Sequence, residues 1–559
     1  MKEATGAPPR QHIQNDPSNP GLRPPVALAG GLALAIVTLA AYWPGLGGGF
    51  VWDDPDYVVN NATLRSAEGL VRMWTDFRSL PQWYPLVHTT YWIEYQLFGL
   101  NPLVFKITNL VLHIATALLL WRLLRVLGVP GAYLGALVFA VHPVHVESVT
   151  WITERKNTLS GLFYLAAFGA YWKWRLGVGA WSPDGAPAPA ESKRQNLLYL
   201  AAVALFACAL LSKTVTATLP AAILVVLWWK TGRVQFRDAV ALLPFLAMGV
   251  AMGSLTAWLE RHHVGAVGPE WDHAPVERVL IAGRAAWFYF GKLIWPVNLA
   301  FMYERWTIDP RSPLQWLYPV SAAAVAITLL LLRNRIGRGP AACALLFGGT
   351  LLPALGFFNV YPHRYSFVAD HFQHLASIAV TSGLAALLAS RAGRAAPAVG
   401  VVLIGVLATL TFRQARVYES PVTLWLDTAA KSPGNWIAWT QLGRSLADER
   451  QIDGAVAAHR RAFELNPTVP DTCYNMAMVY ARQNRTDDAE AMLRRTIELS
   501  SPKAALHLDA MIKLGLLYED QRNDPATAEQ WYRRSVETGP GYPPAERAYA
   551  DFLRRRGRG

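Results

Sequence analysis

Residues 396–412 read APAVGVVLIGVLATLTF, and residues 413–435, which follow directly, read RQARVYESPVTLWLDTAAKSPGN. The first stretch has no charged side chain, whereas charged side chains recur throughout the second. Similar apolar runs recur from residue 26 onward, and polar sequence fills the chain from 413 to 559. A hydrophobic run of about 18 residues or more with few charges is typical of a transmembrane helix. The boundary at 412 therefore separates a predicted membrane domain, 26–412, from a predicted soluble domain.

The composition supports a membrane protein. Of the 559 residues, 53% are hydrophobic and 16% are charged, against about 25% charged in a typical soluble domain. The net charge of +13 could indicate a nucleic-acid partner. However, many Lys and Arg residues fall in short loops between apolar runs, which is the positive-inside pattern of membrane topology. We therefore expect no nucleic-acid partner. Arg outnumbers Lys among the 52 cationic residues, which favours a bacterial source and hence the inner membrane.

Eleven apolar runs predict an all-α membrane domain with about eleven spans. Two of the runs, 197–211 and 215–229, are short and predict a tight hairpin around Lys213. The segment 275–296 is apolar but contains four charged residues, so we expect a helix lying in the outer interface, with a further span as the alternative. The predicted spans are 26–46, 104–124, 132–149, 158–174, 197–211, 215–229, 239–259, 314–332, 341–358, 372–390 and 396–412.

Basic residues in alternate loops predict the orientation. These loops are expected in the cytoplasm, together with a disordered N-terminal tail, 1–25. The long loops 47–103 and 260–313 then lie outside, and the C-terminal domain is expected in the periplasm. Chemistry on the outer side would be built from these long loops.

The C-terminal domain has an internal repeat of about 34 residues. Trp439, Leu442, Gly443, Ala455 and Ala462 fit the tetratricopeptide-repeat (TPR) pattern of large and small residues at fixed spacings. Similar positions recur twice more, which predicts a linker helix over 413–435, about three TPR units over 436–541 and a basic tail over 542–559. Arg residues on the repeats predict either solvated helix faces or a concave surface for an acidic or extended polypeptide.

Two adjacent carboxylates follow the first predicted span. Asp53 and Asp54 lie only a few residues beyond Leu46, so an extended chain keeps them within about 25 Å of the span's end. Carboxylates at this place can accept a proton from a hydroxyl nucleophile or hold a divalent ion. The alternative is a turn with a helix N-cap.

A second group of polar residues follows the third predicted span. The spacing of His142 and His145, with Glu147 nearby, is by itself a weak indication of a metal site. Arg155 and Lys156 lie outside, against the topological bias, and a phosphate group at the outer leaflet would explain them. The alternative is local ion pairing with acidic neighbours, Glu147 and Glu154.

Further candidates lie in other outer segments. Lys213 is a cation in a very short outer loop, and Arg364 and His371 lie in an outer loop that enters the tenth span. Arg364 and His371 either face one cleft or are simply interfacial.

Three features together resemble the transmembrane-and-TPR (TMTC-type) proteins. They are Trp52-Asp53-Asp54, the run 141–149 (VHPVHVESV) continuing into 154–157 (ERKN), and the C-terminal TPR array. TMTC-type proteins are GT-C-fold glycosyltransferases, and their eukaryotic members look like protein O-mannosyltransferases. The likeness covers roughly residues 26–541. The present chain departs from them in having only about three repeats.

The resemblance implies an activity and a set of partners. The expected enzyme takes a sugar from a polyprenyl-phosphate donor in the membrane lipid and transfers it to a hydroxyl, such as a protein Ser or Thr, on the outer side. By position, Asp53 and Asp54 would supply the catalytic base, with a divalent metal as an open alternative. Residues expected to bind the donor phosphate are Arg155, Lys156, Lys213 and Arg364. The TPR array would bind the acceptor or a partner protein. The alternative is a non-catalytic, membrane-anchored TPR scaffold for envelope assembly.

Overall fold

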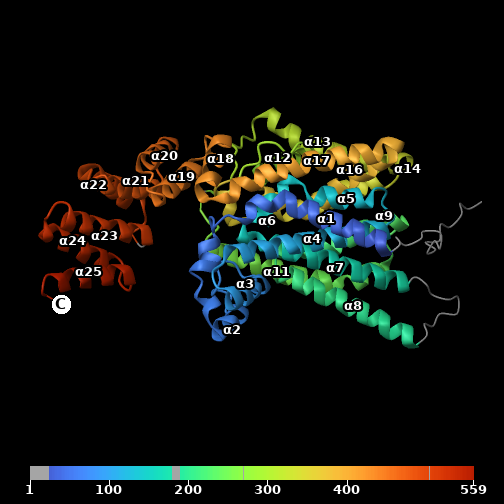
Figure 1. Cartoon of the computed structure of the whole chain (residues 1–559), viewed down its shortest axis with the longest axis horizontal. Helices are drawn as coiled ribbons and strands as arrows, with labels where there is room; N and C mark the ends of the chain where they lie inside the picture. Colours follow the sequence, from blue (N-terminus) through green and yellow to red (C-terminus); the bar gives the residue numbers. More distant parts are fainter. Residues whose placement is uncertain (1–23, 179–188, 269, 503, 559) are drawn as a thin grey trace, which may run out of the picture.

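The computed structural model describes residues 24–178, 189–268, 270–502 and 504–558, and these residues contain helices but no β-strand. The helices of the first part lie side by side, and a helical array extends from one of their ends (Figure 1). The chain is thus an all-α protein with a polytopic membrane domain followed by a TPR solenoid, as predicted. The predicted tail lies outside the described residues up to residue 23, and Pro24 and Pro25 already belong to the first helix.

Each predicted span corresponds to a helical segment, although not all of them are long. Within the described ranges, six helices are long and apolar enough to cross a membrane, or seven if one bent pair counts as a span. Two more apolar helices, Gly339–Ala354 and Ser377–Arg391, are shorter. The helices of this part are α1 (Pro24–Leu46), α4 (Pro102–Val126), α5 (Ala132–Ala140), α6 (Val146–Thr150), α7 (Arg155–Val178), α8 (Pro189–Leu210), α9 (Leu219–Thr231), α10 (Phe236–Ala241), α11 (Leu243–Leu259), α13 (Pro313–Leu331), α14 (Arg333–Ile336), α15 (Gly339–Leu351), α16 (Ser377–Arg391) and α17 (Ala396–Arg416).

The third predicted span is broken. Helix α5 ends at Ala140, and the chain bends by 48° before it continues through Pro143–Thr150. Pro143 lacks the backbone N–H that an unbroken helix requires at this position. The break turns the residues after it toward the inside of the bundle, where His142 and His145 are buried.

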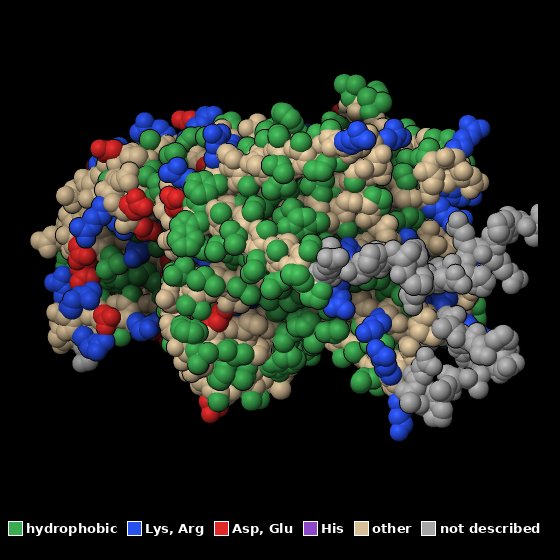
Figure 2. All heavy atoms as spheres, turned by 45° about the vertical axis from the view of Figure 1, so that its right-hand side comes forward, with side chains coloured by type: hydrophobic (Ala, Val, Ile, Leu, Met, Phe, Trp, Pro, Cys, Tyr) green, Lys and Arg blue, Asp and Glu red, His purple; other side chains and the backbone are tan. Residues whose placement is uncertain are grey.

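The two ends of the membrane domain differ. Figure 1 shows α14 and the C-terminal end of α7 at one end, with the repeat array at the other. Two helices of the loop 47–103, which is predicted to lie outside and is called the first outer loop below, also lie at the repeat end: α2 (Ala67–Thr75) and α3 (Pro85–Phe98). Figure 2 shows hydrophobic side chains over the middle of the molecule, which is the surface expected to face lipid.

The segment predicted to lie in the interface forms α12 (Pro275–Ile294). Near its start, Arg278 Nη1 donates to the Gly356 carbonyl at 3.0 Å. Near its end, the Leu293 carbonyl accepts from His142 Nε2 at 3.1 Å. After the helix, the Leu299 carbonyl accepts from Gln414 Nε2, in the last turn of α17, at 3.2 Å. Both flanks of α12 are therefore tied to other segments of the membrane domain, and its position in the outer interface stays a prediction.

The soluble part contains α18 (Pro421–Lys431) and then the repeats. Three helix pairs stack, and a further helix, α25 (Pro543–Arg555), covers the last pair with Phe552 buried. The segment predicted as a basic tail is therefore mainly a capping helix. The pairs are α19 (Trp436–Asp448) with α20 (Ile452–Leu465), α21 (Pro470–Arg482) with α22 (Thr486–Leu499), and α23 (Ala505–Asp520) with α24 (Pro525–Thr538).

One residue of the first repeat, His459, is polar but buried. His459 is 1% exposed, packs on Gly443, and neither ring nitrogen has a hydrogen-bond partner among the described residues. In the third repeat Tyr532 packs on Gly515 in the same way. Burial lowers the pKa of His459 to about 4. The unfolded chain therefore binds the proton first, and stability is lost as pH falls below about 6.5.

We expect His459→Phe to stabilise the protein by about 1–3 kcal/mol, because it removes two unpaired buried nitrogens. Thermal unfolding of the full chain at neutral and mildly acidic pH measures the effect, and the gain should be larger at the acidic pH. Arg460→Gln, at the exposed neighbouring position, is the control. A lower melting temperature for His459→Phe would mean that the imidazole is satisfied in the folded protein.

Candidate active site

A cavity of about 1340 Å³ lies at the repeat end of the membrane domain. Segments far apart in sequence meet around it: the first outer loop, the segment after α6, the turn before α9, the end of α11 and the loop before α16. Of the predicted site residues, those that line it are Asp53, Glu147, Glu154, Lys156, Lys213 and His371. The fold thus gathers six candidates from four separate stretches into one space.

Asp53 is half-buried and lines the cavity. Within the described parts of the chain, no group donates a hydrogen bond to its carboxylate. Burial raises the pKa of this carboxyl to about 7, although the charge of Lys156 opposes the shift. An unpaired carboxylate whose pKa lies close to neutral pH is well suited to accept a proton from a substrate.

Asp54 lies in a different environment. It is fully buried and is not among the residues that line the cavity. Its carboxylate accepts from the Val51 backbone N–H at 2.9 Å and from the N–H and Oγ1 of Thr153 at 2.9 and 2.7 Å. Burial raises the pKa of Asp54 to about 6, with these hydrogen bonds opposing the rise. The side chain therefore ties the first outer loop to the segment that carries Glu154.

Two lysines converge on Glu154. Lys156 Nζ lies 3.0 Å from Oε1 and Lys213 Nζ lies 3.2 Å from Oε2. Asn157 Nδ2 donates to Oε2 at 2.6 Å, and its own Oδ1 accepts from Lys213 at 2.8 Å. Burial acts to raise the pKa of Glu154, but His371 and the two lysines outweigh it and hold the pKa well below its usual range. The Glu154 carboxylate thus holds both lysines in place. Glu154, Lys156 and Lys213 form a cationic cluster, which carries a net positive charge.

His371 connects this cluster to Glu147. Its Nδ1 lies 3.0 Å from Glu147 Oε1, and its backbone N–H donates to Oε2 at 2.9 Å. Its Nε2 lies 3.8 Å from Glu154 Oε1. The loop before α16 is therefore fixed against the segment after α6, and both carboxylates have cationic or proton-donating neighbours.

Other predicted residues lie elsewhere. Arg155 is fully buried, donates to Asn109 Oδ1 at 2.8 Å and to the Phe105 carbonyl at 2.6 Å, and pairs with Glu94. Arg364 lies outside the set of residues that line the cavity, 3.9 Å from Glu270.

The two histidines after α5 also lie apart from the cavity wall. His142 Nε2 bonds to the Leu293 carbonyl, and His145 lies 3.2 Å from His374 Nδ1 and, on its other nitrogen, 3.2 Å from Ser377. Among the residues that the structure describes, no group of three His, Cys, Asp or Glu side chains is arranged to hold a metal ion.

Sequence reasoning missed several residues at the end of α11. Glu260 is buried and accepts from Gln82 Nε2 at 2.8 Å and from the Tyr361 N–H at 3.0 Å. Arg261 lines the cavity, is exposed, and has no ion pair or hydrogen bond with any described residue. The cluster Glu260-Arg261-His262-His263 directly after an apolar run was the available signal for both.

Comparisons with known proteins agree with the sequence resemblance. Residues 468–538 match the tetratricopeptide repeat family. The chain is 34% identical over 147 residues to protein O-mannosyl-transferase TMTC3 of Mus musculus, which covers 24% of this chain and 16% of that protein. It is 31% identical over 150 residues to protein O-mannosyl-transferase F38B6.6 of Caenorhabditis elegans, covering 24% and 22%. It is 33% identical over 168 residues to protein O-mannosyl-transferase TMTC1 of Homo sapiens, covering 27% and 18%.

These matches confirm the resemblance to TMTC-type proteins over about a quarter of the chain. Each match spans less than a quarter of the relative's own length.

Proposed function

We propose that the protein is a membrane glycosyltransferase of the GT-C type. It transfers a sugar from a polyprenyl-phosphate donor to a hydroxyl acceptor, such as a protein Ser or Thr, on the periplasmic or luminal side. The observation that carries the proposal is the unpaired carboxylate of Asp53, with its raised pKa, in the same cavity as Lys156 and Lys213.

In the proposed reaction, the carboxylate and the cations of the cavity have different roles. As the acceptor oxygen attacks the anomeric carbon, its proton passes to the Asp53 carboxylate. The bond between that carbon and the phosphate oxygen breaks, and the electron pair leaves with the lipid phosphate. Lys156 and Lys213 stabilise the negative charge that develops there, and the unpaired Arg261 is a third cation on the wall. Arg155, Arg364, His142 and His145 have no direct part in this scheme.

The shape of the cavity supports a lipid-linked donor. Its apolar wall includes Val215, Ala257 and Ala354, from the segments around α9, α11 and the turn after α15. These residues line the same space as Lys156 and Lys213. A donor with a charged phosphate and a long apolar chain matches such a two-part lining.

The repeat array lies at the same end as α2 and α3 of the loop 47–103 (Figure 1), and the same loop contributes Asp53 to the cavity wall. Trp425 of α18 packs edge-on against Trp52 and Phe301, with ring centroids 5.3 Å apart in both cases. Trp52 and Phe301 both line the cavity, so the base of the array contacts the cavity wall next to Asp53. An acceptor polypeptide held by the repeats would therefore lie close to the proposed base.

The test is transfer by the purified, full-length protein in lipid nanodiscs. The protein is incubated with radiolabelled polyprenyl-phosphate sugars and a Ser/Thr-containing peptide mixture. We expect label to move from lipid to peptide with at least one sugar. If no labelled donor is consumed while the protein remains folded, the alternative of a membrane-anchored TPR scaffold is supported instead.

The pH dependence of the transfer activity should report the ionisation of the Asp53 carboxyl. The base acts in its ionised form, and its pKa is raised to about 7. We therefore expect kcat/KM to rise with pH through about 7, since this parameter reports the pKa values of the free enzyme's groups. It should fall again above about pH 8, because burial lowers the pKa of Lys213 to about 8 and the uncharged amine no longer stabilises the leaving phosphate. An ordinary Asp, with a pKa of about 3.9, would give a flat profile over the same range. A flat profile down to about pH 5 would exclude Asp53 as a base of this kind.

A further inference from the structure

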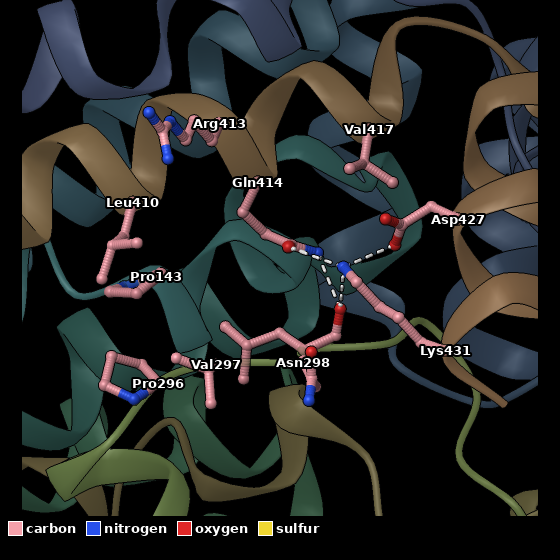
Figure 3. Close-up of a pocket in the computed structure, with 11 residues that line it drawn as sticks. Pro143, Pro296, Val297, Asn298, Leu410, Arg413, Gln414, Val417, Asp427 and Lys431 are labelled. Atoms are coloured by element: carbon pink, nitrogen blue, oxygen red, sulfur yellow. Dashed lines mark hydrogen bonds and ion pairs between the residues drawn. The ribbon is translucent and has the colours of Figure 1, made fainter.

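A second, smaller pocket of about 270 Å³ lies where the membrane domain meets α18. One wall is apolar and includes Pro143, Pro296 and Leu410. The opposite wall includes Asp427 and Lys431 of α18, and Arg413, near the end of α17, lies beside the apolar wall. Figure 3 shows both walls and the polar side chains between them. The pocket shares no lining residue with the cavity that contains Asp53.

The two cations of this pocket differ in how they are engaged. Lys431 Nζ is 2.7 Å from Asp427 Oδ2, and it donates to the Leu299 carbonyl at 2.8 Å. Arg413 projects away from this network in Figure 3. It is exposed and has no hydrogen bond or ion pair with any residue that the structure describes. Arg413 is therefore the cation of this pocket that is free to bind an anion.

The position of Arg413 on its helix indicates where that anion comes from. Val399, Val402 and Val406 are 44%, 65% and 51% exposed, and their spacing of three and four places them on one face of α17. Arg413 follows Val406 by seven residues, and so it lies on the same face, two turns further along. A lipid-facing stripe that ends in an Arg places the guanidinium at the level of the lipid headgroups.

The exposure of the neighbouring segment 294–297 independently indicates that the pocket lies at the level of the lipid headgroups. Trp295, directly before the pocket residue Pro296, is 72% exposed, and Ile294 and Val297 beside it are 44% and 40% exposed. Exposed Trp side chains are enriched at the boundary between membrane and water. The pocket therefore opens at the lipid headgroups and combines an apolar wall with one free guanidinium.

We propose that this pocket binds the headgroup of an anionic phospholipid of the outer leaflet, with Arg413 contacting its phosphate. The acyl chains lie along the exposed valine stripe of α17. Because Asp427 and Lys431 of the opposite wall belong to α18, the bound lipid bridges the membrane domain and the helix that carries the repeats. It thereby fixes the base of the repeat array to the membrane surface.

The experiment compares the full-length protein with two variants in nanodiscs of phosphatidylcholine, with or without phosphatidylglycerol. Arg413→Gln removes the proposed contact. Arg416→Gln is the matched control, since Arg416 lies on the same turn of α17, is 64% exposed at its side chain, pairs with Glu419 at 3.6 Å and does not line the pocket. The number of phosphatidylglycerol molecules retained after transfer to detergent is measured by native mass spectrometry, together with the melting temperature.

We expect phosphatidylglycerol to be retained by the wild type and by Arg416→Gln, and to raise their melting temperatures. Arg413→Gln should bind it about tenfold more weakly, the loss of roughly one charge-assisted hydrogen bond, while melting normally in phosphatidylcholine alone. Equal retention by both variants would overturn the proposal. So would a stabilisation by inorganic phosphate in detergent that Arg413→Gln abolishes, since the site would then take a free anion rather than a lipid.

Discussion

Replacing Asp53 with Asn is expected to lower the rate of sugar transfer by about 10²–10⁴-fold, the usual contribution of a general base. The amide has nearly the shape of the carboxylate but cannot take the proton of the acceptor hydroxyl. Because no described residue donates a hydrogen bond to the Asp53 carboxylate, the substitution should leave the fold intact. Transfer kinetics in nanodiscs and thermal unfolding, measured on the same preparation, separate the two effects.

Two further variants serve as controls for the Asp53→Asn result. Glu68→Gln changes an exposed carboxylate in the same outer loop and should retain full activity. Asp54→Asn should lower the melting temperature, because the amide group cannot accept from all three donors that Asp54 satisfies, at a cost of about 1–3 kcal/mol. An active Asp53→Asn protein would exclude Asp53 as the base. An inactive Asp54→Asn protein with normal stability would show that the assignment between the two carboxylates is reversed.

Replacing Arg155 with Ala is expected to prevent stable folding. Its guanidinium is fully buried and pairs with Glu94. It also lies 4.6 Å from the centre of the Tyr91 ring. Removing one partner of a buried pair leaves an uncompensated charge and typically costs about 3–5 kcal/mol. We therefore expect little Arg155→Ala protein in membranes, as measured by immunoblot and by fluorescence-detected gel filtration.

A contrasting variant separates this structural role from phosphate binding. Lys213→Gln should fold normally, because Lys213 is partly exposed to the cavity, but it should raise the KM for the lipid donor. The double variant Arg155→Met/Glu94→Gln removes both buried charges and should recover part of the lost protein. A well-folded Arg155→Ala protein with a raised donor KM would instead support the role of Arg155 that the sequence suggested.

The local parts of the fold follow directly from sequence patterns. Runs such as 104–124 must form helices in lipid, because every backbone N–H and C=O there has to be bonded within the segment. The 34-residue spacing that relates Gly443 to Ala477 predicts stacked helix pairs, and the structure contains them. The break at Pro143 was harder to predict, since the apolar run continues on both sides of it.

The separation of Asp53 from Asp54 depended on contacts across the fold. Adjacent carboxylates look equivalent in sequence, and only the proximity of Thr153, 99 residues away, directs Asp54 inward. The same applies to Arg155 and Lys156. Arg155 points to Glu94 and Asn109, whereas Lys156 reaches the cavity. Their difference is set by which helices pack against the start of α7.

By itself, the sequence determined that this chain is a membrane domain followed by TPR units, because hydrophobicity and helical periodicity act over neighbouring residues. It also identified the stretches that supply the candidate site. The tertiary structure alone decided which side chains of those stretches face a common cavity, since burial and pairing depend on partners far away in the chain. The raised pKa of Asp53 and the free guanidinium of Arg413 both arise from that long-range packing.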